Sequence, residues 1–271
     1  MTTERRTAPA EVARWVLREQ RPALLGWALA LAAIAAMYLA FWPTMGDNPE
    51  MQALVDGLPE AIVVGMGWDR IATAAGYLES TIYGLLGPAL LLVFAVATGA
   101  RVLAGEEESG TLELELSGPT TRRRVLLERF AALALGALGL SAVVGVTTVA
   151  LVLGLEMDVG LPEVVAATFG LWLFVLAMGA VAFAAGAATG RRGIAVAVGA
   201  GAAVAAYLAD ALAPVVGDGA WLHRLSPFSW YLHGDPLVQG LDLGGSAALV
   251  ALTVVAVGVG LVRFERRDLG V

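Results

Sequence analysis

Few side chains in this sequence are of the kinds that do chemistry, and their spacing forms no catalytic set. All 17 basic residues are Arg, since Lys is absent, and Cys is absent too. Without Lys, the chain has no phosphate-binding loop for a nucleotide, no Schiff base and no Ser-Lys dyad. Without Cys, disulfides, thiolate nucleophiles and Cys-based metal sites are excluded. Because only two His are present, a His-rich metal site is not expected, and we expect this chain to bind no cofactor of its own.

The charged groups that remain are densest between residues 101 and 129. Three carboxylates lie early in this segment and three arginines follow: Glu106, Glu107, Glu108, Arg122, Arg123 and Arg124. Carboxylates are stable at the positive N-terminus of a helix, which predicts a helix starting near Gly105. Leu and Glu then alternate over residues 112–116, which is the period of a strand. A lone strand here would lack a partner for its backbone groups, so we predict a short helix instead.

These groups must be positioned by a structure that lies in lipid. The 271 residues are 58% hydrophobic and 15% charged, with a net charge of −7, whereas soluble domains average about 25% charged residues. The acidic balance also argues against nucleic-acid binding, which needs a basic surface. Six apolar runs, uncharged except for Asp210 at the end of the fifth, are long enough to cross a bilayer. They predict spans at about residues 22–44, 80–100, 130–154, 164–189, 193–211 and 243–262.

The arginines predict the orientation of these spans. If both termini face the cytoplasm, 15 of the 17 Arg lie on the inner side, and only Arg70 and Arg224 lie outside. Positive residues stay on the cytoplasmic side, so this orientation is strongly favoured. The predicted fold is therefore all-α: an integral membrane protein with six transmembrane helices, cytoplasmic N- and C-termini, and one domain over residues 1–271. The high Ala, Gly, Val and Arg content suggests a GC-rich prokaryotic genome and hence a prokaryotic inner or plasma membrane.

The segments outside the spans carry interfacial signals. Residues 8–21 predict a short amphipathic helix on the membrane surface, with Val12, Trp15 and Val16 sharing one face. The apolar run that follows is too long for a cleavable signal peptide. The outer loops are predicted at residues 45–79 and 212–242. Aromatic rings commonly anchor at the membrane interface, and the second loop contains four that we expect to do so: Trp221, Phe228, Trp230 and Tyr231.

Three motifs resemble those of a known family. Glu108-x-Gly110-Thr111-Leu112-Glu113-Leu114, followed by Ser117-x-Pro119 and the three arginines, resembles the first cytoplasmic loop of ABC-2 type permeases. These proteins are the membrane subunits of ATP-binding-cassette exporters. Residues 225–236, before the last span, and residues 263–269, at the C-terminus, are similar to the same family. The resemblance therefore covers the chain from end to end.

The resemblance implies roles for the loop over residues 101–129. In that family the loop forms a cytoplasmic coupling helix that docks into a groove on the ATP-hydrolysing subunit, and the surface helix before the first span braces it. The residues in or beside this coupling helix would be Glu106, Glu107, Glu108, Gly110, Thr111, Leu112, Glu113 and Leu114. Arg122, Arg123 and Arg124 would lie at the membrane boundary, where topology alone also places arginines. Glu115 departs from the family, in which an apolar residue is more common at this position.

The number of spans predicts the partners. The chain supplies one six-span half, whereas an exporter of this type needs two, so we expect a dimer, most simply a homodimer with twofold symmetry. ATP and Mg²⁺ would be bound by a separate ATPase subunit, present in two copies. Closure of the ATPases would move the coupling helices and open a central path outward. A mostly apolar path suits a hydrophobic or amphiphilic cargo.

Three other interpretations stay open. An ATP-independent channel or secondary transporter would be expected to carry an ionisable residue in mid-membrane, and the six runs contain none there. An intramembrane enzyme would use Ser141 or Ser246, but both His lie in the outer loop, out of reach of a mid-membrane serine. A purely structural membrane protein is the third. Co-purification of an ATPase subunit separates the exporter from all three.

Overall fold

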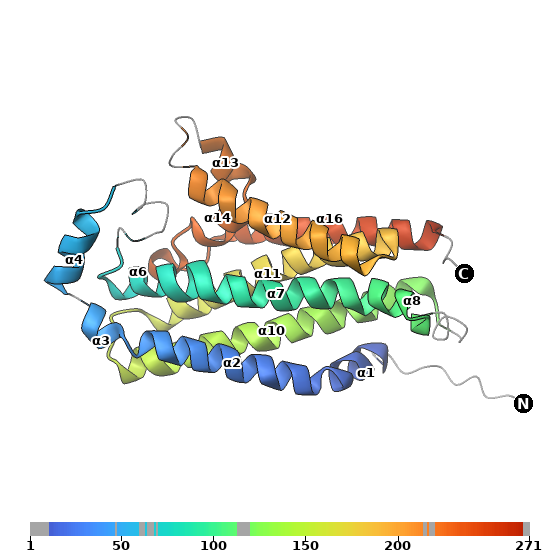
Figure 1. Cartoon of the computed structure of the whole chain (residues 1–271), viewed down its shortest axis with the longest axis horizontal. Helices are drawn as coiled ribbons and strands as arrows, with labels where there is room; N and C mark the ends of the chain where they lie inside the picture. The colour runs from blue at the N-terminus through green and yellow to red at the C-terminus, as the bar shows by residue number, and fades with distance from the viewer. Residues whose placement is uncertain are drawn as a thin grey trace, which may run out of the picture.

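The computed structural model describes residues 11–46, 48–59, 63, 68, 70–112, 120–213, 216 and 220–267. Within these ranges the chain is almost entirely helical and contains no strand. Six helices are long and apolar enough to cross a membrane, which confirms the predicted all-α, six-span architecture. They lie side by side in one elongated bundle (Figure 1).

The second of the six helices is the longest. It runs without a break from Ala74 to Glu108 and combines α6 (Ala74–Leu78), η1 (Glu79–Leu86), α7 (Gly87–Ala100), η2 (Arg101–Gly105) and α8 (Glu106–Glu108). We call it the α6–α8 helix; it extends beyond the predicted span in both directions. The other long helices are α2 (Arg21–Leu39), which leads into α3 (Trp42–Met45), α10 (Arg122–Gly154), α11 (Leu161–Thr189), α12 (Arg192–Leu212) and α16 (Leu243–Arg266). The short helices are α1 (Glu11–Glu19), α4 (Pro49–Asp56), α13 (Ala220–Leu225), α14 (Pro227–Leu232) and α15 (Pro236–Gln239).

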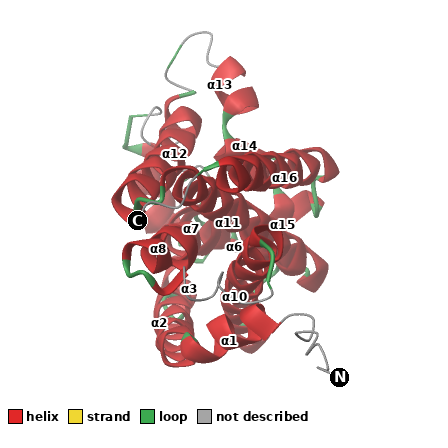
Figure 2. Ribbon diagram, turned by 90° about the vertical axis from the view of Figure 1, so that its right-hand side faces the viewer, coloured by secondary structure: helices red, strands yellow, loops and turns green. Residues whose placement is uncertain are grey.

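The core of the bundle is organised around α11. It is the most buried of the six long helices and packs against α7, α10, α12 and α16. In both the side view and the end-on view, α7 lies between α2 and α12 (Figures 1 and 2). Small residues allow the helices to approach closely. A Cβ on Gly99 of α7, for example, would lie 2.6 Å from the carbonyl oxygen of Gly179 in α11, so only glycine fits there.

The α6–α8 helix contains two wider π-type turns, η1 and η2. Pro88 explains the first, because proline has no N–H to donate to the carbonyl of Gly84 one turn earlier. π-Type turns are rare in helices and are frequent at functional sites. One of the two lies near each end of this helix, so both ends are candidates for function.

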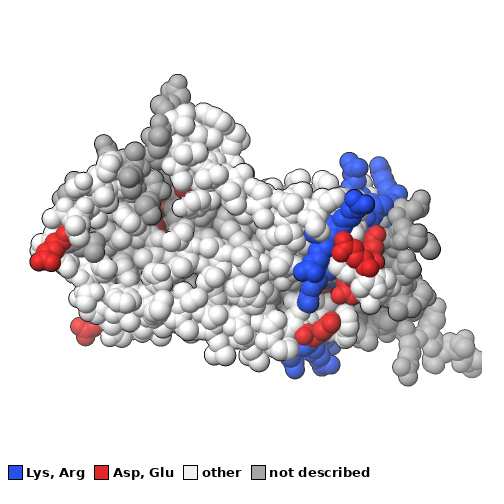
Figure 3. All heavy atoms as spheres, in the orientation of Figure 1, with Lys and Arg blue, Asp and Glu red and all other residues white. Residues whose placement is uncertain are grey.

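The two ends of the bundle differ in charge. Arginines gather at one end, here called the arginine end (Figure 3): Arg101, Arg122, Arg123, Arg124, Arg191, Arg192, Arg263, Arg266 and Arg267. The first helix, α1, and the end of α16 both lie there (Figure 1). The opposite end carries α3, α4, α6, α13 and α14, and we call it the loop end.

The amphipathic helix predicted near the N-terminus is present as α1, but its buried face is rotated from the predicted one. Ala13 and Val16 are buried, whereas the Trp15 side chain is 51% exposed. The reason is that α1 packs against α10, and α10 covers the face centred between Ala13 and Val16.

Candidate functional site

The predicted coupling residues lie at the arginine end, where the α6–α8 helix stops. Glu106, Glu107 and Glu108 form its last turn, not the first turn of a new helix near Gly105. That part of the prediction is wrong. Gly110, with a left-handed φ of 75°, follows the helix end, as glycine commonly does after a C-terminus. We call residues 105–112 the elbow.

Three carboxylates at a helix C-terminus are repelled by the negative end of the helix dipole. Each of them is stabilised by a contact with a different group. Glu106 accepts a hydrogen bond from the hydroxyl of Thr111, with 2.5 Å between the oxygens. Glu107 forms an ion pair with Arg267 beyond the end of α16. Glu108 Oε1 accepts from the backbone N–H of Arg192 at 2.8 Å. Since Arg192 is the first residue of α12, Glu108 stabilises the N-terminus of that helix.

The C-terminal residues close around the elbow. Arg122 Nη1, at the start of α10, donates to the carbonyl oxygens of Phe264 at 3.2 Å and Arg267 at 2.7 Å. Gly190, in the turn between α11 and α12, has a φ of 65°, and a Cβ there would collide with the Arg267–Glu107 pair. We call the contacts among Glu107, Glu108, Arg122, Arg267 and the backbone of α12 the C-terminal clasp. It joins the elbow to the ends of α10, α12 and α16.

Arg129 was missed as a functional residue by sequence reasoning, which counted it only for topology. Its side chain is 2% exposed, and Nη1 donates a hydrogen bond to the carbonyl oxygen of Val102 in η2. Helical spacing could have indicated that Arg129 is buried, because it lies on the same face of α10 as Arg122 and the buried Leu126. Arg129 thus holds α10 against the π-type turn before the elbow.

The surface helix is attached to the same region. Glu128 Oε2 accepts from the backbone N–H of Val12 at 2.8 Å, in the first turn of α1. Arg124 Nε donates to the other oxygen of Glu128 at 2.7 Å. A carboxylate at a helix N-terminus is favourable. The contact fixes α1 on the flank of α10; the bracing of the coupling segment that the family resemblance implies stays a prediction.

The accessible part of the predicted site is a single turn. Glu108, Ser109, Gly110 and Thr111 are exposed, whereas Leu112 is fully buried within its own chain. Glu113 and Leu114 lie outside the described residues. Of the three arginines, Arg122 and Arg124 have partners as above. Arg123 is exposed and forms no ion pair or hydrogen bond with the part of the chain that the structure describes.

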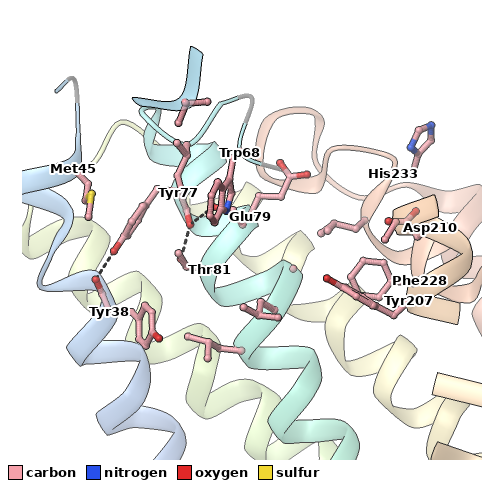
Figure 4. A pocket seen from close by; sticks show the side chains of 18 of the residues that line it. Tyr38, Met45, Trp68, Tyr77, Glu79, Thr81, Tyr207, Asp210, Phe228 and His233 are labelled. Carbon is pink, nitrogen blue, oxygen red and sulfur yellow. Dashed lines mark hydrogen bonds between the residues drawn. The ribbon is translucent and has the colours of Figure 1, made fainter. Parts of the chain in front are cut away.

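A second site, which the sequence did not predict, is a cavity of about 820 Å³ at the loop end (Figure 4). Its walls come from α2, α3, α4, η1, α12 and α14, and most of its lining side chains are apolar or aromatic. Tyr77 stands beside α2, and its hydroxyl donates to the carbonyl oxygen of Tyr38 at 2.6 Å. The acidic residues on its lining, Glu79 and Asp210, fall at the ends of the second and fifth predicted spans.

Asp210, His223 and Ser229 meet at the edge of this cavity, but they do not form a catalytic triad. Ser229 donates to Asp210 Oδ1, and His223 Nδ1 lies 3.2 Å from both Asp210 Oδ1 and Ser229 Oγ. A triad needs the two ring nitrogens on different partners, with one on the aspartate and the other on the nucleophile. Here one nitrogen faces both, and Ser229 is 4% exposed. The arrangement orients Asp210 and does not activate Ser229.

The predicted aromatic anchors divide into two groups. Trp221 is 55% exposed and Trp230 is half-buried, but Phe228 and Tyr231 are each 4% exposed. The prediction is wrong for these two, because α14 turns back into the bundle and both rings pack against Phe174, at 5.5 and 5.7 Å between centroids. Residues expected at the interface therefore close the core beside the cavity.

Comparison with protein families identifies the family of this chain. A family model described as "ABC-2 family transporter protein" matches residues 16–269, almost the whole chain. No curated protein matches.

Proposed function

Because the chain belongs to the ABC-2 family of transporter proteins, we propose that it is the permease subunit of an ATP-driven exporter, moved by a separate ATPase that docks at the arginine end. The observation that carries the proposal is the exposed elbow. Its turn is accessible, yet the C-terminal clasp and Arg129 connect it to α10, α12 and α16. A displacement of the elbow is thereby passed to several membrane helices at once, as shear or rigid-body motions require.

The arginine end faces the cytoplasm in this proposal. Positive residues are retained on the cytoplasmic side of membranes, and the described residues place the arginine clusters, α1 and the end of α16 at this one end (Figures 1 and 3). The loop end then faces outward from a prokaryotic plasma or inner membrane. ATP and Mg²⁺ are bound by the partner subunit, in two copies.

The surface that meets the ATPase is the turn over residues 108–111 together with Arg123. All of these residues are exposed. Leu112 acts as the anchor that holds the turn in the core, and Glu106 and Glu107 fix its shape through Thr111 and Arg267. Glu113 and Leu114, which the family resemblance also assigns to coupling, lie outside the described residues.

A second copy of the chain completes the pathway. The exposed residues of the α6–α8 helix recur every fourth position as one stripe: Leu85, Ala89, Val93, Ala97 and Arg101. α7, which carries Ala89, Val93 and Ala97, lies between α2 and α12 (Figures 1 and 2). Both flanking helices bury little of their own surface. We assign this face to the dimer and its central path, which makes the path apolar over most of its length.

The test of the proposal is a co-purification from native membranes. The tagged chain is expected to co-purify with an ATP-hydrolysing subunit. The amount of this subunit should fall at least about tenfold in the charge-reversed variants Glu108→Arg and Arg123→Glu. The matched control is Asp158→Arg, which alters an exposed carboxylate near the loop end. Purification of an active transporter with no ATPase would reject the proposal in favour of an ATP-independent transporter.

Orientation is tested separately by cysteine labelling, since the natural chain contains no Cys. With a membrane-impermeant maleimide, Asp158→Cys should react in intact cells, whereas Ser109→Cys should react only after the cells are opened. The reverse pattern would place the elbow outside and end the coupling proposal.

A further inference from the structure

The loop-end cavity is lined by aromatic rings from several directions. Tyr38 and Phe41 lie on the α2–α3 side and Trp68 and Tyr77 near η1, while Tyr207 and Phe228 lie on the α12–α14 side (Figure 4). Tyr207 and Phe228 meet edge to face, with 5.4 Å between ring centroids. The faces of such rings attract cations, most strongly where water is excluded. A cavity of about 820 Å³ also falls within the usual size range of small-molecule sites.

Two carboxylates line the cavity and are largely withdrawn from water. The side chains of Glu79 and Asp210 are 19% and 26% exposed. Among the described residues, Ser229 and His223 contact Oδ1 of Asp210 and not Oδ2, so Oδ2 is available to a ligand. A partly desolvated carboxylate attracts a cation more strongly than one in bulk water does.

The nearest arginine does not cancel this negative charge. Arg70 binds Asp235 through both terminal nitrogens, at 2.7 and 3.0 Å, and also contacts Glu79 at 2.8 Å. One positive charge is thus shared between two carboxylates, and Asp210 lies outside that group. The lining includes Glu79, Asp210, His223 and His233 and no arginine, so with neutral imidazoles its balance is negative, which disfavours anionic ligands. Acidic atoms are visible deep in a hollow at this end of the molecule (Figure 3).

The cavity also lies where a cargo would pass. Its lining includes Leu85, which begins the exposed stripe on the α6–α8 helix, and the same two helices, α2 and α12, flank both. An apolar molecule moving along the stripe therefore reaches the cavity at the outer end of the bundle. Apolar walls, aromatic faces and two recessed carboxylates select one class of molecule.

We infer that this cavity binds lipophilic organic cations, and that such cations are the cargo class of the exporter. The second half of this inference rests on the proposed function, whereas the binding itself does not. The aromatic rings hold the apolar body of the cation, and Glu79 and Asp210 hold its charge. Small hydrated cations do not match the site, since the described residues include no group of three or more His, Asp or Glu side chains suited to a metal ion.

The experiment measures binding of tritiated tetraphenylphosphonium to the purified full chain in lipid nanodiscs, with protein-free nanodiscs as the blank. Tetraphenylborate, which has nearly the same shape and the opposite charge, is the matched ligand. Saturable binding of the phosphonium and no saturable binding of the borate are expected. Asp210→Asn, which keeps a hydrogen-bond acceptor for Ser229, and Glu79→Gln should each weaken phosphonium binding about tenfold.

Two further variants separate a lost site from a misfolded one. Tyr207→Leu removes one aromatic face from the cavity and should bind the phosphonium about fivefold more weakly. Asp158→Asn, which neutralises an exposed carboxylate outside the cavity lining, should change nothing. Equal binding of both ions, or phosphonium binding that survives the Asp210 and Glu79 changes, would overturn the inference. If phosphonium binds but no ATPase co-purifies, the site stands and the exporter proposal fails; the converse result leaves the exporter with another cargo.

Discussion

The two ends of the α6–α8 helix carry acidic residues in opposite ways. At the arginine end, Glu107 and Glu108 are in direct contact with Arg267 after α16 and with the first residue of α12. A cavity of about 770 Å³ beside the end of α16 includes Arg267 in its lining but neither glutamate. At the loop end, Glu79 and Asp210 border a cavity of about 820 Å³. Carboxylates that are bonded to a neighbouring helix can pass a movement from one helix to the next. Carboxylates at a cavity wall can instead bind a ligand. This difference is the basis on which we propose coupling at the arginine end and ligand recognition at the loop end.

One continuous helix joins these ends, so they are not independent. α7 contacts α11 over its length, and the close approach at Gly99 keeps the two helices in register. If the elbow moves as proposed, we expect the movement to reach η1, which lines the cavity. The predictions below test this connection first and then each end in turn.

The largest effect is expected from Gly99→Leu. A side chain there would clash with the carbonyl oxygen of Gly179, which lies 2.6 Å from the Cβ position. Overpacking of this kind should lower the free energy of unfolding by about 3 kcal/mol, measured by denaturation in mixed micelles. Gly139→Leu is the control, because nothing lies within 4 Å of its Cβ position. Equal losses for the two variants would mean that α7 and α11 are not closely packed.

A smaller loss is expected when the connection between α10 and η2 is cut. Arg129→Met removes the donor to Val102 while keeping an apolar stem of similar length, and should cost about 2 kcal/mol. ATP hydrolysis by the assembled complex should become insensitive to cargo. Arg266→Met changes an exposed arginine at the end of α16 and should alter neither quantity. Full coupling in the Arg129 variant would remove this residue from the transmission path.

The C-terminal clasp is tested by a double-mutant cycle on Glu107→Gln and Arg267→Met. Their side chains are 14% and 21% exposed, so the pair is only partly screened, and a coupling free energy of about 1 kcal/mol is expected. A cycle on Glu107→Gln and Arg266→Met should give no coupling free energy, because Arg266 is exposed and not part of the pair. A coupling near zero for Arg267 would leave Glu108, through its contact with the N-terminus of α12, as the connection of the elbow to the clasp.

The sequence predicted the spans well because exclusion of charge from lipid is a property of each run by itself. The elbow was predicted less well. Its acids were assigned to a helix N-terminus, since the groups that neutralise them are remote in sequence: Arg267 is 160 residues from Glu107, and Arg192 is 84 residues from Glu108. Only the fold brings these partners to a C-terminal turn.

The cavity could not be predicted from the sequence for a related reason. Its lining comes from segments between Tyr38 and His233, and no local pattern shows which aromatic rings face inward. Phe228 and Tyr231 had the composition of interfacial anchors, but packing on Phe174 turned them into the core. The charged residues at span ends, Glu79 and Asp210, were the one signal available.

The smallest effect is expected at the loop end, where Tyr77→Phe removes a single contact across the cavity. The Tyr77 hydroxyl donates to the carbonyl oxygen of Tyr38 at 2.6 Å and so links η1's neighbour α6 to α2. Hydrogen bonds between membrane helices contribute about 0.6 kcal/mol, so the stability should fall by about that amount, while phosphonium binding should weaken by less than threefold because the ring stays in place. Tyr38→Phe provides the control, since the Tyr38 hydroxyl makes no hydrogen bond within the described residues. If Tyr77→Phe instead abolished phosphonium binding, the shape of the cavity would depend on this one hydrogen bond. The loop end would then depend on specific contacts between helices, as the arginine end does.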